Sequence, residues 1–264
     1  MNKCERCGSE IIENSGASSF CSKCRDEANK IALASLVSGE KNVCEPDLSP
    51  MVFDTRYSTK ILLVRHGESL GNAAHIVLGH TDLDMSERGH RQAARTAELL
   101  KNEKIDVVYS SSLLRAYNTA LPHARLRDLE VIKSDAMREM YVGEWENRSV
   151  AELIEEYGEI FTVEWRQRFG TFNHLKRGET VPALAERVYR EVDRIARENV
   201  GKTVLIGTHA AALRAFWGKL NGTPPEDVND TWTFAENASV SVVYFNGNEL
   251  IPGEYSHSAH LADI

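Results

Sequence analysis

The stretch Lys60-Ile61-Leu62-Leu63-Val64-Arg65-His66-Gly67-Glu68-Ser69 decides the fold of this 264-residue chain. Residues 60–64 read as a short buried strand, and the glycine after the arginine and the histidine predicts a turn. In an open α/β sheet, ligands bind beyond the carboxyl ends of the strands, so Arg65 and His66 are expected at a crevice rather than in the core. An arginine beside a histidine at such a place suggests a phosphate ligand.

Two later segments repeat this arrangement, and a third adds a carboxylate. The apolar run Val107–Tyr109 precedes a helix whose first turn contains Arg115, and the apolar run Thr203–Gly207 precedes a helix that opens at His209. Glu139 follows the second of these three strands later in the chain. Two arginines, two histidines and one carboxylate are therefore predicted to converge on the strand ends.

Strand and helix patterns alternate along the chain, which predicts an α/β fold with a mostly parallel sheet covered on both faces. One long amphipathic helix is expected from apolar residues that recur at intervals of three and four: Val181, Leu184, Val188, Val192 and Ile195. Thr180 is its expected N-cap. Ser239–Phe245 is expected to add a further strand.

The motifs over about residues 58 to 250 resemble those of the histidine phosphatase superfamily, also called the phosphoglycerate mutase-like family. Several pieces keep the order and spacing of that family: Arg65 to Ser69 with Asn72, Gly79 to Leu83, Ser86 to Gly89 with Gln92-Ala93, Ser112 to Ala116 with Thr119-Ala120, Gly178 to Thr180, and Thr208-His209. The resemblance implies a three-layer α/β/α sandwich. It also implies phosphate-ester chemistry through a phosphohistidine.

The resemblance assigns the nucleophile to His66, because a neutral imidazole attacking phosphorus splits one hard displacement into two easier ones. It places Arg65 and Arg115 on the phosphate oxygens, with His209 completing the cradle at a helix N-terminus. It points to Glu139 as the general acid that then activates water. Since the arginines take the place of a metal, no cofactor is expected for catalysis. The predicted substrate-binding residues are Ser69, Asn72, Gly79 and Thr81.

The segment between the general acid and the second histidine looks shorter than in the family's mutases, which favours a phosphatase. Within it, Phe161, Trp165 and Phe169 recur every four residues and predict a helix over the active site. Ala210 and Ala211 stand where the family often has glycines, and we interpret this as a change of pocket shape. We expect hydrolysis of a small phosphorylated metabolite. A phosphoglycerate mutase and a phospho-ligand or protein-binding module with little catalysis remain as alternatives.

Cys4, Cys7, Cys21 and Cys24 form two Cys-x-x-Cys pairs. Four thiolates complete the tetrahedral coordination of one structural zinc ion, so these residues predict a zinc ribbon. The alternative is a pair of disulfides, as in small secreted domains. Charged residues crowd the first ten positions and no apolar signal-peptide segment follows, which favours zinc in a reducing cytoplasm.

These signals predict a zinc ribbon over residues 1–26, a short helix and polar linker over 27–57, a catalytic domain over 58–250 and a C-terminal tail over 251–264. The apolar run Ile31–Val37 is too short to span a bilayer, so no membrane partner is expected. A net charge of −8 and balanced charges in the ribbon argue against nucleic acid binding. The ribbon is expected to dock a protein partner or to stabilise the chain, and a homodimer stays open.

Overall fold

The computed structural model describes residues 58–158 and 178–264, all within one compact unit. The predicted ribbon, the helix and linker over 27–57, and the predicted helix with Phe161, Trp165 and Phe169 lie outside these residues. The strands are β1 (Thr59–Arg65), β2 (Ile76–Val77), β3 (Val107–Ser111), β4 (Val131–Ser134), β5 (Arg148–Ser149), β6 (Thr203–Thr208), β7 (Val240–Phe245) and β8 (Leu250–Pro252). The α-helices are α2 (Leu70–Ala73), α3 (Glu87–Leu99), α4 (Leu114–Arg125), α5 (Val150–Tyr157), α7 (Val181–Glu198), α8 (Ala210–Leu220) and α9 (Val228–Thr231). Short 3₁₀ turns are η1 (Asp135–Met137), η2 (Gly143–Trp145), η4 (Pro225–Asp227) and η5 (Ala259–Leu261).

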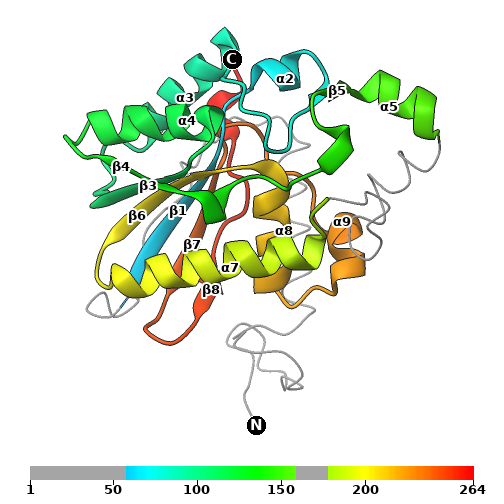
Figure 1. Ribbon diagram of the computed structural model, residues 1–264. Helices are drawn as coiled ribbons and strands as arrows, with labels where there is room; N and C mark the ends of the chain where they lie inside the picture. Colours follow the sequence, from blue (N-terminus) through cyan, green and yellow to red (C-terminus); the bar gives the residue numbers. More distant parts are fainter. Residues whose placement is uncertain (1–57, 159–177) are drawn as a thin grey trace, which may run out of the picture. The chain divides into compact units, whose positions relative to one another are not determined.

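The main sheet has the strand order β4-β3-β6-β1-β7-β8 (Figure 1). β4, β3, β6 and β1 run parallel, whereas β7 pairs antiparallel with β1 and β8 antiparallel with β7. The mostly parallel sheet predicted from the sequence is therefore confirmed. β1 and β6 are neighbours although most of the chain separates them in sequence, and this pairing brings their carboxyl ends together.

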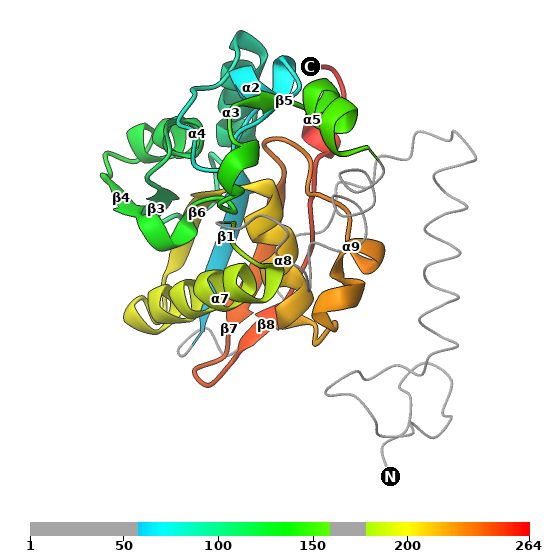
Figure 2. The ribbon, with the colours of Figure 1, turned by 45° about the vertical axis from the view of Figure 1, so that its right-hand side comes forward.

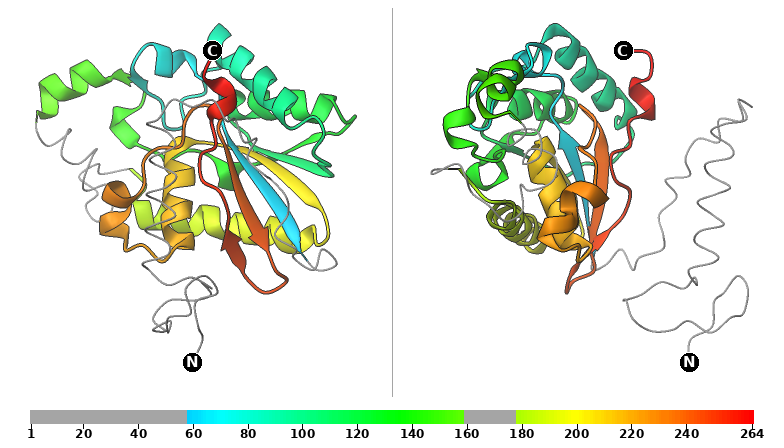
Figure 3. Two further views of the ribbon diagram at one scale, coloured as in Figure 1. Left: turned by 180° about the vertical axis from the view of Figure 1, so that it is seen from behind. Right: turned by 90° about the vertical axis from the view of Figure 1, so that its right-hand side faces the viewer.

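Strand β1 shows why helices cover both faces of the sheet, because its side chains alternate between two cores. Ile61 and Leu63 pack with residues of α7 and α8, whereas Leu62 and Val64 pack with residues of α4 and the end of α3. Each of these side chains contributes about 1.5–3 kcal/mol by its burial. Figures 1 and 3 show α7 and α8 on one face and α3 and α4 on the other, which gives the three layers.

Short elements gather beyond the carboxyl end of β1. β2 and β5 pair there through Ile76 with Ser149 and Val77 with Arg148. Figures 1 and 2 show α2, β5 and α5 together at this end. They build a wall over the edge of the sheet at which an α/β fold places its ligand site.

The long helix α7 begins as the sequence predicts. Thr180 occupies the N-cap, its hydroxyl accepts a hydrogen bond from the N–H of Ala183 (3.3 Å), and Pro182 lies in the first turn. The hydroxyl of Ser149 caps α5 in the same way, as part of a capping box with Glu152. No helix in the described part of the chain is both long and apolar enough to cross a membrane.

The residues predicted as a C-terminal tail pack on the catalytic domain. The predicted boundary at residue 250 cuts through β8. Beyond β8, the backbones of His257 and Val240 exchange two hydrogen bonds, and His260 Nε2 lies 2.9 Å from the hydroxyl of Thr96 in α3. Residues 251–264 are thus part of the domain's structure.

The turn after β1 depends on the close approach of two glycines. A Cβ atom on Gly67 would lie 2.4 Å from the carbonyl oxygen of Gly89, and one on Gly89 would lie 2.0 Å from that of Glu68. The N–H of Gly67 donates to the hydroxyl of Thr119 (3.0 Å), and that of Glu68 donates to Gln92 Oε1 (2.8 Å). Motif residues of α3 and α4 therefore fix this turn without lining a cavity.

We predict that Gly89→Ala loosens this turn, because the new methyl group must displace the carbonyl of Glu68. Overpacking of this kind lowers the free energy of unfolding by about 1–3 kcal/mol. The sharper readout is amide hydrogen exchange, which should accelerate at Gly67 and Glu68. The control is Gly201→Ala, where φ is +78° and no atom lies within 4 Å of the new Cβ. Gly201→Ala should lower the free energy of unfolding by about 1–2 kcal/mol and leave the amides of Gly67 and Glu68 protected from exchange. Unchanged exchange in Gly89→Ala would contradict the prediction.

Candidate active site

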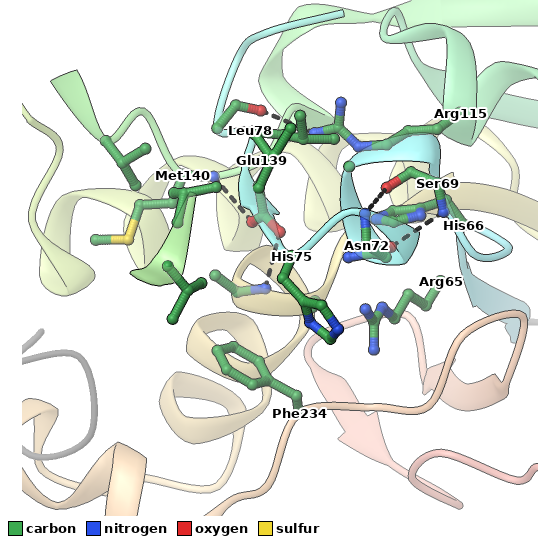
Figure 4. Close-up of a pocket in the computed structure, with 18 of the residues that line it drawn as sticks. Arg65, His66, Ser69, Asn72, His75, Leu78, Arg115, Glu139, Met140 and Phe234 are labelled. Atoms are coloured by element: carbon green, nitrogen blue, oxygen red, sulfur yellow. Dashed lines mark hydrogen bonds between the residues drawn. The ribbon is translucent and has the colours of Figure 1, made fainter. Parts of the chain in front are cut away.

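A cavity of about 270 Å³ lies at the carboxyl end of β1 (Figure 4). Its lining includes most of the predicted site residues and several that the sequence analysis did not single out: Arg65, His66, Ser69, Asn72, His75, Gly79, Arg115, Glu139, Ala210, Ala211, Arg214 and Phe234. They come from the turn after β1, from α2 and the strand β2 region, from the first turn of α4, from α8 and from the segment before β7. Parallel packing of β1 and β6 is what brings these segments to one edge.

His66 follows β1 directly and is 4% exposed. Its Nδ1 atom lies 2.7 Å from the carbonyl oxygen of Gly67. A carbonyl oxygen can only accept, so Nδ1 must carry the ring proton and Nε2 keeps its lone pair. The backbone is fixed as well, because the N–H of His66 donates to the carbonyl of Thr208 (2.9 Å) and Asn237 Nδ2 donates to the carbonyl of His66 (3.0 Å). This tautomer leaves Nε2 free to attack.

Burial holds the pKa of His66 well below its ordinary value of 6.5, and the positive charges of Arg115 and Arg65 lower it further. Burial, followed by the charges of Arg115 and His66, lowers the pKa of His209 in the same way. Both imidazoles are therefore neutral at pH 7. Only the neutral form has the lone pair that a nucleophilic histidine needs.

Backbone carbonyl oxygens orient Arg65 and Arg115. Arg115 is 1% exposed, and its Nη1 and Nη2 donate to the carbonyl oxygens of Thr81 (2.9 Å) and Gly79 (2.8 Å). Arg65 donates through Nη1 to the carbonyl of Ala235, while its Nε is buried and has no hydrogen-bond partner in the described residues. A buried donor without a partner is rare in proteins. A phosphate oxygen in the cavity would satisfy it.

Glu139 lines the cavity next to the first turn of α8. Its Oε1 accepts from the N–H of Ala212 (3.0 Å) and its Oε2 from the N–H of Ala211 (3.1 Å). The carboxylate thus caps a helix that has no side-chain cap of its own. The neighbouring Arg138 pairs with Asp135 (2.9 Å).

The turn that carries Glu139 is fixed by Arg187 of α7. Its guanidinium donates to the carbonyl oxygens of residues 136, 138 and 139 at 2.8, 3.1 and 3.3 Å. Arg187 also pairs with Glu179 at 2.7 Å, which gives the Gly-Glu-Thr motif a structural role. His80 Nε2 lies 2.8 Å from the carbonyl oxygen of Glu139. His80 therefore supports the turn and does not line the cavity.

His209 is fully buried at the N-cap position of α8 and does not line the cavity. Its ring packs against that of His66, with centroids 5.2 Å apart and an angle of 57° between the planes. Nε2 lies 2.8 Å from the hydroxyl of Ser111, and the buried Nδ1 has no hydrogen-bond partner among the described residues. His209 lies beside the predicted nucleophile, with one ring nitrogen unsatisfied.

Three of the four predicted substrate-binding residues line the cavity. Ser69 and Asn72 do so from a capping box, in which each side chain accepts from the other's backbone N–H (3.0 and 3.1 Å). Gly79 lines it and also holds Arg115 through its carbonyl. Thr81 does not line the cavity, and its contribution in the structure is the second carbonyl that orients Arg115.

Arg214 and Phe234 line the cavity without having been predicted. Arg214 follows Ala210 and Ala211 at the spacing of one helical turn, so helical periodicity alone could have placed it on the same face. Phe234 lies in the irregular segment before β7 and had no such signal. His75 also lines the cavity, from a position with φ +53°.

No group of three or more His, Cys, Asp or Glu side chains in the described ranges, 58–158 and 178–264, is arranged to hold a metal ion. The predicted zinc ligands are outside these ranges: Cys4, Cys7, Cys21 and Cys24. The zinc site therefore stays a prediction of the sequence.

The geometry at the cavity is that of a phosphate cradle with a neutral imidazole inside it. The sequence model of the histidine phosphatase superfamily (branch 1) matches residues 61–253. The chain belongs to this superfamily. The family predicted from the sequence is thereby confirmed.

Relatives within the histidine phosphatase superfamily include hydrolases and mutases. Phosphoserine phosphatase 1 of Hydrogenobacter thermophilus is 34% identical over 206 residues, covering 78% of this chain and 95% of the relative. A 2,3-bisphosphoglycerate-dependent phosphoglycerate mutase of an Arthrobacter species is 31% identical over 198 residues, covering 64% of this chain and 80% of the relative. A solved mycobacterial glucosyl-3-phosphoglycerate phosphatase has a TM-score of 0.68 at 22% identity, over 76% of this chain and 100% of that one, which shows a shared fold.

We predict that the imidazole of His66 stays neutral between about pH 8 and pH 6, a range in which an ordinary histidine with a pKa near 6.5 gains its proton. Burial and two arginines lower its pKa, so protonation is displaced to more acidic pH. The unfolded chain binds this proton below about pH 6.5 and the folded chain does not, so the free energy of unfolding falls as the pH drops through 6.5. Nitrogen-15 NMR of the imidazole rings measures the titration directly. A midpoint for His66 at or above 6.5 would refute this account of the site.

Proposed function

We propose that this chain is a phosphomonoesterase that hydrolyses a small phosphorylated metabolite through a phosphohistidine on His66. The observation that carries the proposal is the neutral imidazole of His66 with Nε2 unprotonated, since Nδ1 faces a carbonyl oxygen at 2.7 Å. Arg65, Arg115 and Glu139 line the same cavity. Membership of the histidine phosphatase superfamily and its phosphatase relatives support hydrolysis.

In the first step, His66 Nε2 attacks phosphorus and the bond to the ester oxygen breaks. Glu139 enters this step as the carboxylic acid and gives its proton to the leaving oxygen, so the alcohol leaves neutral and Glu139 becomes a carboxylate. Arg65 and Arg115 neutralise charge on the equatorial oxygens, with the unsatisfied Nε of Arg65 as a further donor. In the second step, Glu139 takes a proton from water, the water oxygen attacks phosphorus, and the N–P bond breaks. Inorganic phosphate and free His66 result.

A phosphoglycerate mutase is the second candidate, because a mutase of the superfamily is 31% identical to this chain. It would use the same phosphohistidine but shield it from water and return the phosphoryl group to a second hydroxyl. The phosphoserine phosphatase relative matches more of this chain, 78% against 64%, which favours hydrolysis. O-phosphoserine and 3-phosphoglycerate are the first substrates to assay, with release of phosphate measured against its transfer between hydroxyls.

We predict that His66→Asn abolishes turnover and the acid-labile phosphoenzyme, because the phosphoryl acceptor is gone. Glu139→Gln should show a dependence on the leaving group instead. For an alkyl phosphate, kcat/KM should fall by about 10²–10⁴, since the alkoxide needs a proton. For p-nitrophenyl phosphate it should fall by much less, since nitrophenolate leaves without one.

These two variants separate the assigned roles. Equal losses for both substrates in Glu139→Gln would remove Glu139 from the proton transfer and leave the nucleophile intact. A phosphoenzyme that survives in His66→Asn would overturn the mechanism. Transfer of the phosphoryl group without net release in the wild type would select the mutase.

We also propose that residues 1–26 form a zinc ribbon, whose four thiolates suit a reducing compartment such as the cytoplasm. Its balanced charge fits a protein-docking or stabilising module better than nucleic acid binding.

Metal analysis of the whole chain should find about one zinc per protomer, because four thiolates complete one tetrahedral site. Cys4→Ser with Cys7→Ser should lose it, because two thiolates do not hold the ion. Cys44→Ser is the matched control and should retain it, since Cys44 lies outside both pairs. Zinc retained in the double variant would rule out this ligand set.

A further inference from the structure

One cation in the cavity has no assigned task in phosphate chemistry. Arg214 lies in the interior of α8 and is 8% exposed, yet it lines the cavity. No hydrogen bond or ion pair joins its guanidinium to any of the described residues, whereas Arg65 and Arg115 are both anchored by backbone carbonyls. A buried charge without a partner is costly, so a fold rarely keeps one without a ligand to pair it.

The guanidinium of Arg214 is oriented by an aromatic ring instead. Its central carbon lies 3.8 Å from the ring centroid of Phe234. Stacking on a ring occupies one face of the guanidinium plane and leaves the in-plane N–H groups free, and those groups form the fork that grips a carboxylate. Burial lowers the pKa of Arg214 to about 10, so the group stays charged at pH 7. Arg214 is thus a preformed donor of two parallel hydrogen bonds.

Arg214 and Arg65 contact two consecutive residues of one segment. Phe234 carries the ring under Arg214, and the carbonyl of Ala235 accepts from Arg65. Neighbouring Cα atoms are about 3.8 Å apart, so both arginines are placed by the same short segment. In Figure 4, Phe234 and Arg115 lie on opposite sides of the cavity. Since Arg214 lines the same cavity as Arg65 and Arg115, one molecule with two anionic groups can contact all three.

We propose that Arg214 binds a carboxylate of the substrate, so that the preferred substrates are phosphomonoesters that also carry a carboxylate. The inference rests on the phosphomonoesterase function proposed above and adds the substrate class. One cation matches a monoanionic carboxylate. A second phosphate dianion would call for a pair of cations, as the first site provides in Arg65 and Arg115.

Binding to the non-turnover variant His66→Asn tests this independently of catalysis. The matched ligands are 3-phosphoglycerate and glycerol 3-phosphate, which differ in a carboxylate against a hydroxymethyl group. Calorimetry should find 3-phosphoglycerate bound about 30-fold more tightly or better, the scale of a buried charge pair. Adding Arg214→Gln should reduce this ratio to about threefold or less. Arg190→Gln, at an exposed arginine of α7, is the matched control and should retain the full ratio.

Three outcomes overturn the proposal. Equal binding of the two ligands before Arg214 is changed would show that no carboxylate is recognised. An unchanged ratio in Arg214→Gln would assign the recognition to another residue. Arg214→Gln could instead lower the preference for fructose 1,6-bisphosphate over fructose 6-phosphate and leave the preference for 3-phosphoglycerate over glycerol 3-phosphate unchanged. The second anion would then be a phosphate.

Failure of the phosphomonoesterase proposal has a different signature. If the chain is not a phosphomonoesterase, the wild-type protein will release no phosphate from any monoester, whatever ligand-binding ratios the variants show. Arg214→Lys in the wild-type background adds a kinetic readout. It keeps the charge but loses the fork, so it should raise KM for 3-phosphoglycerate more than it lowers kcat.

Discussion

The parallel pairing of β1 with β6 is the constraint on which the site depends. The register sets Arg65 opposite Thr208, and the N–H of His66 bonds to the carbonyl of Thr208 at 2.9 Å. One residue further, His66 and His209 leave the two strands side by side, with ring centroids 5.2 Å apart. A shift of one residue in this register would send every side chain of β1 to the opposite face and move the nucleophile out of the cavity.

The second constraint is electrostatic, since the cavity concentrates positive charge. Arg65, Arg115 and Arg214 line it, and Glu139 is the carboxylate on its lining. This excess suits a phosphate dianion, and it adds to burial, which is the larger cause, in lowering the pKa of both buried histidines. The same field therefore attracts the substrate and preserves the nucleophile.

Much of the motif lies outside the cavity and acts through the backbone. Thr119 and Gln92 hold the amides of the turn after β1, and Arg187 with His80 holds the turn of Glu139. These side chains do not line the cavity, but they fix the positions of the residues that line it. Geometry errors of about 1 Å at the reacting groups are costly in enzymes, which gives these supports their importance.

The sequence by itself predicted the mostly parallel sheet and the clustering of Arg65, His66, Arg115 and Glu139, because hydrophobic periodicity and strand-end chemistry are local signals. The resemblance of its motifs indicated the family. It placed Thr81 among the substrate contacts, although the structure uses its carbonyl to hold Arg115. Only the tertiary structure decided the tautomer of His66, the capping of α8 by Glu139, and the stacking of Arg214 on Phe234 without an ion-pair partner among the described residues. These depend on contacts between segments far apart in the chain, and no local pattern of residues encodes whether a buried charge finds a partner.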